Sequence, residues 1–90
     1  MSATRQVLIA NRRGLHARAS AKFVTLASGL PCEVKVEKEP GSAVTGTSIM
    51  GLMMLGAAMG DTITISATGD GAEGAVQALC ELVEAKFGED

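Results

Sequence analysis

The chain of 90 residues has no tryptophan and no tyrosine, and phenylalanine occurs only twice. With so few aromatic rings, we do not expect a platform on which nucleic-acid bases stack. The formal net charge of -2 gives no overall attraction to nucleic acid. No apolar run reaches the length of a membrane span, and the first twenty residues lack the apolar stretch of a signal peptide. We therefore expect a cytoplasmic protein that binds neither nucleic acid nor membrane.

Cysteine and histidine are also scarce. Only Cys32 and Cys80 are present, neither belongs to a CxxC pair, and the chain has one histidine. These residues are too few for the four ligands of an ordinary zinc site. We therefore expect no metal site, no cofactor, and two buried free thiols in a reducing compartment.

Acidic residues are missing from the first third of the chain. The cations that precede the first carboxylate, Glu33, are Arg5, Arg12, Arg13, Arg18 and Lys22. The small net charge therefore conceals a basic region, which favours an anionic ligand or an acidic partner. Arg12 and Arg13 taken alone are also typical of a solvated basic loop.

The composition, with 47% apolar residues, suits one small domain over residues 1–90. Alternating and helical apolar spacing predicts strands at 5–10, 32–38, 42–45 and 61–68 and helices at 17–28, 49–55 and 72–87. This βαββαβα order predicts an α+β fold, an open-faced β-sandwich in which three helices cover one face of a four-stranded antiparallel sheet. The last strand would be inserted between the first two.

The first and last predicted helices each carry an apolar stripe that we expect to be buried. In the first helix the stripe comprises Ala19, Phe23, Leu26, Ala27 and Leu30. In the last helix it comprises Ala72, Ala75, Val76, Leu79, Leu82, Val83 and Phe87. Gly29 is the expected stop of the first helix.

The only histidine, His16, lies in the run GLHAR between a predicted strand and a predicted helix. Histidine can act as a nucleophile, a base or a ligand near neutral pH. The free N–H groups of the helix start and the forked donors of Arg18 would surround whatever the ring carries. This combination suits a phosphate group, although a lone histidine at a helix start is also commonly a surface residue or a cap.

Two separated motifs make the chain resemble a known family. The run GLHARASAKFV, the later run SIMGLMMLGA and the element order resemble HPr, the histidine-containing phosphocarrier of the bacterial phosphotransferase system, from about Val7 to Phe87. The chain is most similar to the proteobacterial branch that includes the nitrogen-related system. The resemblance implies that His16 accepts a phosphoryl group on Nδ1 from phosphorylated enzyme I and passes it to an enzyme IIA-type protein. It further implies an HPr-like monomer that is a phosphotransfer protein rather than an enzyme.

The resemblance also assigns the surroundings of His16. The backbone N–H groups of Ala17 and Arg18 would bind phosphate oxygens, and the Arg18 guanidinium would stabilise the phosphate. The family usually has proline where this chain has Ala19, and alanine does not pre-set the backbone angle φ. This departure leaves the geometry of the first helical turn, and the choice of partner, open.

Ser48 corresponds to the serine that HPr kinase/phosphorylase modifies in many members of the family. From the residues alone, Thr47 or Ser48 is expected to cap a short helix. Both a capping and a regulatory role of Ser48 therefore stay open.

The segment after Ser48 is apolar on all sides. Ile49, Met50 and Met53 correspond to exposed positions at which family members contact enzyme I and other partners, and methionine suits a surface that meets several partners. The alternative is that they belong to the core. Leu52 and Leu55 are the expected core members.

Two other functions remain possible on this sequence. A regulatory binding module would change partners according to phosphorylation at His16 or Ser48. A small hydrolase with His16 as base is weaker, because no triad partners are apparent. For the phosphocarrier itself, the sequence leaves the sugar-uptake and nitrogen-related branches open.

Overall fold

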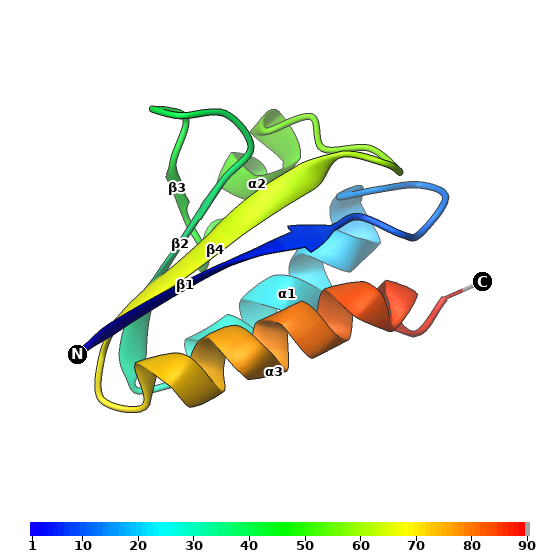
Figure 1. Ribbon diagram of the computed structural model, residues 1–90. Helices are drawn as coiled ribbons and strands as arrows, with labels where there is room; N and C mark the ends of the chain where they lie inside the picture. The colour runs from blue at the N-terminus through cyan, green and yellow to red at the C-terminus, as the bar shows by residue number, and fades with distance from the viewer. Residues whose placement is uncertain (90) are drawn as a thin grey trace.

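The computed structural model describes residues 1–89 (Figure 1). The strands are β1 (Ser2–Leu8), β2 (Cys32–Glu37), β3 (Val44–Thr45) and β4 (Thr62–Gly69), and the helices are α1 (Ala17–Ser28), α2 (Ile49–Met54) and α3 (Ala72–Glu84). A short 3-10 helix, η1 (Lys86–Gly88), follows α3. The βαββαβα order predicted from the apolar spacing is therefore confirmed.

The four strands form one antiparallel sheet in the order β1-β4-β2-β3. Strand β4 lies in the middle and pairs with β1 from Ser2↔Thr68 to Leu8↔Thr62. Its other edge pairs with β2, where Val36 lies opposite Ile65. The last strand is thus inserted between the first two, as the sequence predicted, and the helices cover one face of the sheet (Figure 1).

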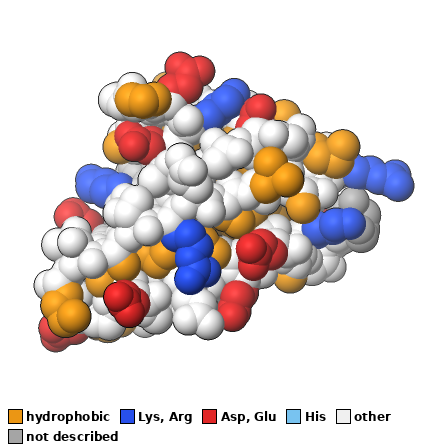
Figure 2. Space-filling view, viewed as in Figure 1, with side chains coloured by type: hydrophobic (Ala, Val, Ile, Leu, Met, Phe, Trp, Pro, Cys, Tyr) orange, Lys and Arg blue, Asp and Glu red, His pale blue; other side chains and the backbone are white. Residues whose placement is uncertain are grey.

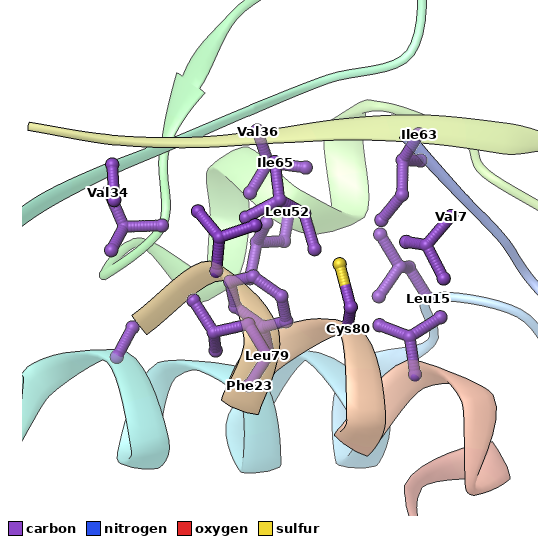
Figure 3. Close-up of a cluster of buried hydrophobic side chains, with 14 of the residues drawn as sticks. Val7, Leu15, Phe23, Val34, Val36, Leu52, Ile63, Ile65, Leu79 and Cys80 are labelled. Carbon is purple, nitrogen blue, oxygen red and sulfur yellow. The ribbon is translucent and has the colours of Figure 1, made fainter. Parts of the chain in front are cut away.

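The core lies between the sheet and the helices (Figure 3). Alternation along β2 and β4 turns Val34, Val36, Ile63 and Ile65 toward the helices, where all four are buried. Phe23 of α1, Leu52 of α2 and Leu79 of α3 meet them from the opposite side and are fully buried. Removal of this apolar surface from water is the main favourable contribution to the stability of the fold.

Three leucines expected in the core lie at its edge instead. Leu26, Leu30 and Leu82 are only partly buried, and they line an open groove of about 640 Å³ between α1 and α3. Two helices that lie side by side on a sheet leave a furrow between them on the solvent side, and these leucines face it. The helical period alone does not distinguish this furrow from the core.

Two further positions are less buried than expected. Leu55 and Cys32 are half-buried, whereas Cys80 is fully buried, and both thiols are free. Cys32 begins the strand β2, where the sheet gives it less cover than it gives Val34. Burial raises the pKa of the Cys80 thiol.

The last helix ends earlier than its apolar period predicted. Helix α3 stops at Glu84, and Lys86 and Phe87 adopt positive φ angles of 59° and 56°. The reversal places the Phe87 side chain in the core, where it is 1% exposed. Burial of such a side chain contributes about 1.5–3 kcal/mol, which is comparable with the roughly 2–4 kcal/mol that two left-handed residues cost.

Candidate functional site

The loop that carries His16 is held by Gly14. This glycine has a φ of +62°, and a Cβ on it would lie 2.4 Å from the carbonyl oxygen of Ala57. The next residue, Leu15, donates its N–H to the same oxygen at 3.0 Å. Only glycine permits both the left-handed backbone and this close approach. The loop before α1 is therefore fastened to the loop after α2.

His16 is the N-cap of α1, with extended backbone angles, and its side chain does not cap the helix. The first hydrogen bond of the helix runs from Ser20 N to the carbonyl oxygen of His16, at 2.9 Å. The N–H groups of the first turn, including those of Ala17 and Arg18, consequently have no acceptor within the helix. The helix start therefore presents free donors and a positive dipole end beside the imidazole.

Ala19 stands in the first turn of α1 at the position where the resemblance implies a proline. Ala19 is fully buried under the first turn, and α1 begins at Ala17, as the sequence predicted. Because alanine is a good helix former and fits the core here, the turn forms without a residue that pre-sets φ.

The imidazole of His16 contacts a carboxylate from the other end of the chain. Its Nε2 lies 2.8 Å from Oε1 of Glu89, and the two side chains are 19% and 16% exposed. The hydrogen bond from His16 is the main cause that holds the pKa of Glu89 below its ordinary value of 4.5, while burial opposes the shift. Hydrogen bonding by Asn11 and the charges of His16 and Lys22 lower this pKa further.

Asn11 donates a hydrogen bond to the same carboxylate. Its side chain is fully buried, and Nδ2 donates both to Gly14 O at 2.9 Å and to Glu89 Oε1 at 3.1 Å. Both partners are acceptors, so the amide orientation with Nδ2 toward them is the one that the hydrogen bonds support. Within residues 1–89, Asn11 Oδ1 is a buried acceptor without a partner.

Asn11 and Glu89 are not among the site residues predicted from the sequence. Asn11 lies in a polar loop that carried no motif, and Glu89 lies 73 residues from His16. The contact depends on the reversal at Lys86 and Phe87, for which the apolar period gives no signal. The contact between His16 and Glu89 therefore could not be predicted from the sequence alone.

Arg18 is exposed on α1 and lies at the edge of the groove between α1 and α3. It forms no salt bridge with any residue from 1 to 89. Lys and Arg side chains also gather at the end of the molecule where the loop before α1 lies (Figure 2). The basic character expected from the sequence is therefore present at the end of the molecule that holds the loop before α1.

Ser48 caps α2, because its Oγ accepts the N–H of Gly51 at 2.9 Å. Ile49, Met50 and Met53 are exposed, so the alternative that they belong to the core is wrong. Met54, which the sequence analysis did not select, is exposed by 80%. Leu52 alone in this helix is fully buried. Helix α2 thus presents an apolar surface, here called the α2 patch: Ile49, Met50, Met53 and Met54.

The described part of the chain, residues 1–89, holds no group of three or more His, Cys, Asp and Glu side chains that could bind a metal ion. Within the same residues, no helix combines the length and apolar character needed to cross a bilayer. The groups that the structure places at His16 are an imidazole, the carboxylate of Glu89 and the backbone N–H groups of the helix start.

Comparison with known proteins identifies the family of this chain. Residues 3–85 match the family model described as the PTS HPr component phosphorylation site. The chain is 44% identical over 84 residues to the phosphocarrier protein HPr of Pseudomonas aeruginosa, covering 93% of each protein. It is 45% identical over 85 residues to the phosphocarrier protein NPr of Shewanella violacea, covering 94% of this chain and 92% of that protein.

The fold agrees with solved structures of the same family. A crystal structure of HPr from Thermoanaerobacter tengcongensis superposes with a TM-score of 0.91 at 42% identity, covering 98% of both chains. HPr from Bacillus anthracis superposes with a TM-score of 0.85 at 36% identity, covering 91% of this chain and 96% of that one. The chain belongs to the HPr family, the phosphocarrier proteins of the bacterial phosphotransferase system, and it is a phosphotransfer protein rather than an enzyme.

Proposed function

We propose that His16 is the residue that carries the phosphoryl group, and that Nδ1 is the nitrogen that bears it. The observation that carries this proposal is the contact between His16 Nε2 and Glu89 Oε1 at 2.8 Å. Because one ring nitrogen is engaged by the carboxylate, the other is left to act as nucleophile. The ring lies at a helix start and is partly exposed, which suits a group that two partners must reach in turn.

The phosphate would be held by the helix start. Backbone N–H groups of Ala17 and Arg18 are available as donors, and the N-terminal dipole of about half a positive charge favours an anion there. The Arg18 guanidinium adds two parallel donors without becoming deprotonated itself. These interactions stabilise the phosphoryl group while leaving it open to solvent and to an acceptor.

The transfer partners are enzyme I as donor and an enzyme IIA-type protein as acceptor, which are the exchange partners that membership of the family implies. The α2 patch would dock them, because α2 packs beside α1 and therefore lies close to His16. An apolar surface with flexible methionine side chains suits a small, short-lived interface with several proteins. The basic residues around it would favour acidic partners.

Ser48 would act as a regulatory site for a kinase of the HPr kinase/phosphorylase class. A phosphoryl group adds a charge of about −1.5 to −2, and the start of a helix tolerates that charge. The same charge beside the α2 patch would repel an acidic partner. Phosphorylation would therefore lower docking and leave the fold intact.

The proposal extends to the compartment, the oligomeric state and the pathway of the protein. We place the protein in the cytoplasm as a monomer with one HPr-like domain, with sugar uptake or nitrogen-related regulation as its pathway. The similarity to a protein named NPr supports the nitrogen-related branch. Competition between a sugar-type and a nitrogen-type IIA protein for the phosphorylated chain would distinguish the two branches by their relative transfer rates.

The test is phosphorylation by enzyme I and phosphoenolpyruvate. We expect an acid-labile, base-stable phosphate on the wild type and none on His16→Ala. Glu33→Gln is the matched control, since this carboxylate is exposed on β2 and its loss should leave labelling unchanged. Labelling that persists in His16→Ala would rule out His16 as the carrier residue.

A further inference from the structure

One serine is buried on the apolar side of α1. Ser20 is 0% exposed, and its neighbours on this side of the helix, Ala19 and Phe23, are equally buried. A buried hydroxyl group costs free energy unless it is hydrogen-bonded, and alanine, which brings no polar atom into the core, has the higher helix propensity. The stability of α1 by itself therefore gives no reason for a hydroxyl group at this position.

The hydroxyl group of Ser20 is engaged at the start of the helix. Its Oγ donates a hydrogen bond to the carbonyl oxygen of Leu15 at 3.2 Å. The backbone N–H of Ser20 donates to the carbonyl oxygen of His16 at 2.9 Å. The first of these oxygens belongs to the peptide group that precedes the Cα atom of His16, and the second belongs to the peptide group that follows it. Ser20 thus holds both peptide groups that flank this Cα atom.

The residue before His16 is also held from outside the helix. Leu15 donates its N–H to Ala57 O at 3.0 Å, so its N–H and its carbonyl group are both bonded. Because the peptide groups on both sides of the His16 Cα atom are held, the angles φ of -77° and ψ of -178° have little freedom. These angles decide where the imidazole lies relative to the N–H groups of Ala17 and Arg18.

We propose that Ser20 is a positioning residue for phosphotransfer, whose hydroxyl group fixes the backbone of His16 so that the imidazole and the N–H groups of the helix start keep one relative position. This inference rests on the function proposed above. Ser20 forms no bond with the phosphoryl group and moves no proton, because it acts through Leu15 and His16. Groups that are in place before the phosphoryl group arrives do not have to be ordered during the reaction, which lowers the barrier.

Two substitutions separate the hydrogen bond from the packing of the side chain. The bond from the backbone N–H of Ser20 is one that any residue except proline would make here, whereas the bond from Oγ depends on the side chain. Ser20→Ala removes the side-chain bond and leaves the helix bond in place. Ser20→Cys fills the same space and keeps a weak S–H donor. The cysteine variant should therefore lie between the wild type and the alanine variant.

The first experiment measures the mobility of the His16 backbone by 15N NMR relaxation on the unphosphorylated chain. We expect an amide order parameter close to the rigid value of about 0.85 in the wild type. The value should be lower in Ser20→Ala and intermediate in Ser20→Cys. Ser66→Ala is the matched control, since it removes a serine hydroxyl that is hydrogen-bonded to Thr4 at 3.3 Å. Ser66 follows the inward-facing Ile65 on β4 and so lies on the face of the sheet away from the helices.

The second experiment measures transfer from phosphorylated enzyme I and separates kcat from KM. Ser20→Ala should lower kcat by about three- to tenfold, the effect of one lost hydrogen bond. The KM should stay unchanged, because the α2 patch is untouched. Ser66→Ala should change neither constant. A thermal unfolding curve for each variant shows that it is folded at the assay temperature, and a merely structural role of Ser20 predicts a wild-type kcat in every folded variant.

The two proposals fail in different ways. A wild-type kcat in folded Ser20→Ala would overturn the role of Ser20, and so would a lower kcat with an unchanged order parameter at His16. If Ser20→Ala does not fold, the same two criteria apply to Ser20→Cys. If the wild type takes no phosphate from enzyme I, the proposed function fails, whereas the order parameters still decide whether Ser20 fixes the backbone of His16.

Discussion

Lys22 on α1 and Phe87 in η1 are joined by a hydrogen bond of 2.6 Å between the ammonium group and a main-chain carbonyl oxygen. The two residues are 65 positions apart, so this bond connects the helix that begins at His16 with the end of the chain. It is one of the contacts that carry Glu89 to the imidazole. Its removal tests how much the attachment of η1 to α1 contributes to stability.

Lys22→Met removes the donor and keeps most of the side-chain length. We expect a loss of about 0.5–1.5 kcal/mol in the free energy of unfolding, the usual net value of one hydrogen bond. Urea unfolding measures this loss. Lys35→Met removes an exposed lysine on β2 and serves as the control. An equal effect of the two substitutions would mean that the bond to Phe87 does not stabilise the fold.

Gly14→Ala should be one of the more damaging single substitutions in the loop. The new Cβ would lie 2.4 Å from Ala57 O on a backbone with a φ of +62°. Left-handed strain and overpacking together predict a loss of roughly 2–4 kcal/mol. Thermal or urea unfolding measures it, and transfer from enzyme I should fall as the loop around His16 shifts.

Gly74→Ala is the matched control for this prediction. Gly74 lies inside α3, and nothing lies within 4 Å of a Cβ placed there. The substitution should therefore stabilise the protein by about 0.5–1 kcal/mol through helix propensity. If both alanine variants change stability in the same direction and by the same amount, the close approach at Gly14 is not the cause of the lost stability in Gly14→Ala.

The loop between α2 and β4 should weaken in acid. The N–H of Ala58 donates to Asp61 Oδ2 at 2.9 Å, and Lys38 Nζ lies 3.2 Å from the same oxygen. The hydrogen bond from Ala58, followed by the contact with Lys38, holds the pKa of Asp61 below its ordinary value of 3.8. A carboxyl with a lowered pKa stabilises the fold above its unfolded pKa, and this contribution is lost as the pH falls through the folded pKa.

The measurement is the unfolding free energy of the wild type and of Asp61→Asn across pH. The wild type should be the more stable at about pH 7, and the difference should shrink below roughly pH 4 as Asp61 takes up a proton. A difference that stays constant down to acid pH would show that the charge of Asp61 does not act on stability.

Substitutions at Ser48 should separate the effect of losing the helix cap on stability from the effect of an added negative charge on transfer. Ser48→Ala loses the cap on Gly51 N and should lower stability by about 1 kcal/mol, with little change in transfer. Ser48→Asp keeps a capping oxygen but adds a negative charge beside the α2 patch, so stability should hold and transfer from enzyme I should slow. Unchanged transfer rates in Ser48→Asp would count heavily against a regulatory role.

The α2 patch should be required for docking and dispensable for folding. Met50 is 70% exposed, so Met50→Glu should leave the melting temperature nearly unchanged. We expect the KM for transfer from enzyme I to rise, because a charge is placed in an apolar contact with an acidic partner. Thr68→Glu adds the same charge at the far end of β4 and should have no effect on transfer. Equal KM values for the two variants would place the docking surface elsewhere.

Much of the fold follows from short-range patterns in the sequence. Alternation at Val34 and Val36, the helical stripe of Ala19 and Phe23, and the cap at Ser48 each arise from neighbours in the chain, and the structure confirms all of them. The basic surroundings of His16 and its position at the start of α1 could be predicted for the same reason. The motifs around His16 and Ser48 pointed to the family that the comparisons support.

Only the tertiary structure decided which groups meet across the chain. The apolar period continues from α3 through Phe87, but burial of this ring requires the chain to reverse at Lys86, and the reversal brings Glu89 to His16. Leu26 and Leu82 fit the same helical stripes as the core, yet two helices packed on one sheet leave them in a groove. Local sequence patterns indicate which face of a helix or strand is buried. The contacts between distant elements depend instead on how these buried faces pack against one another in a single core.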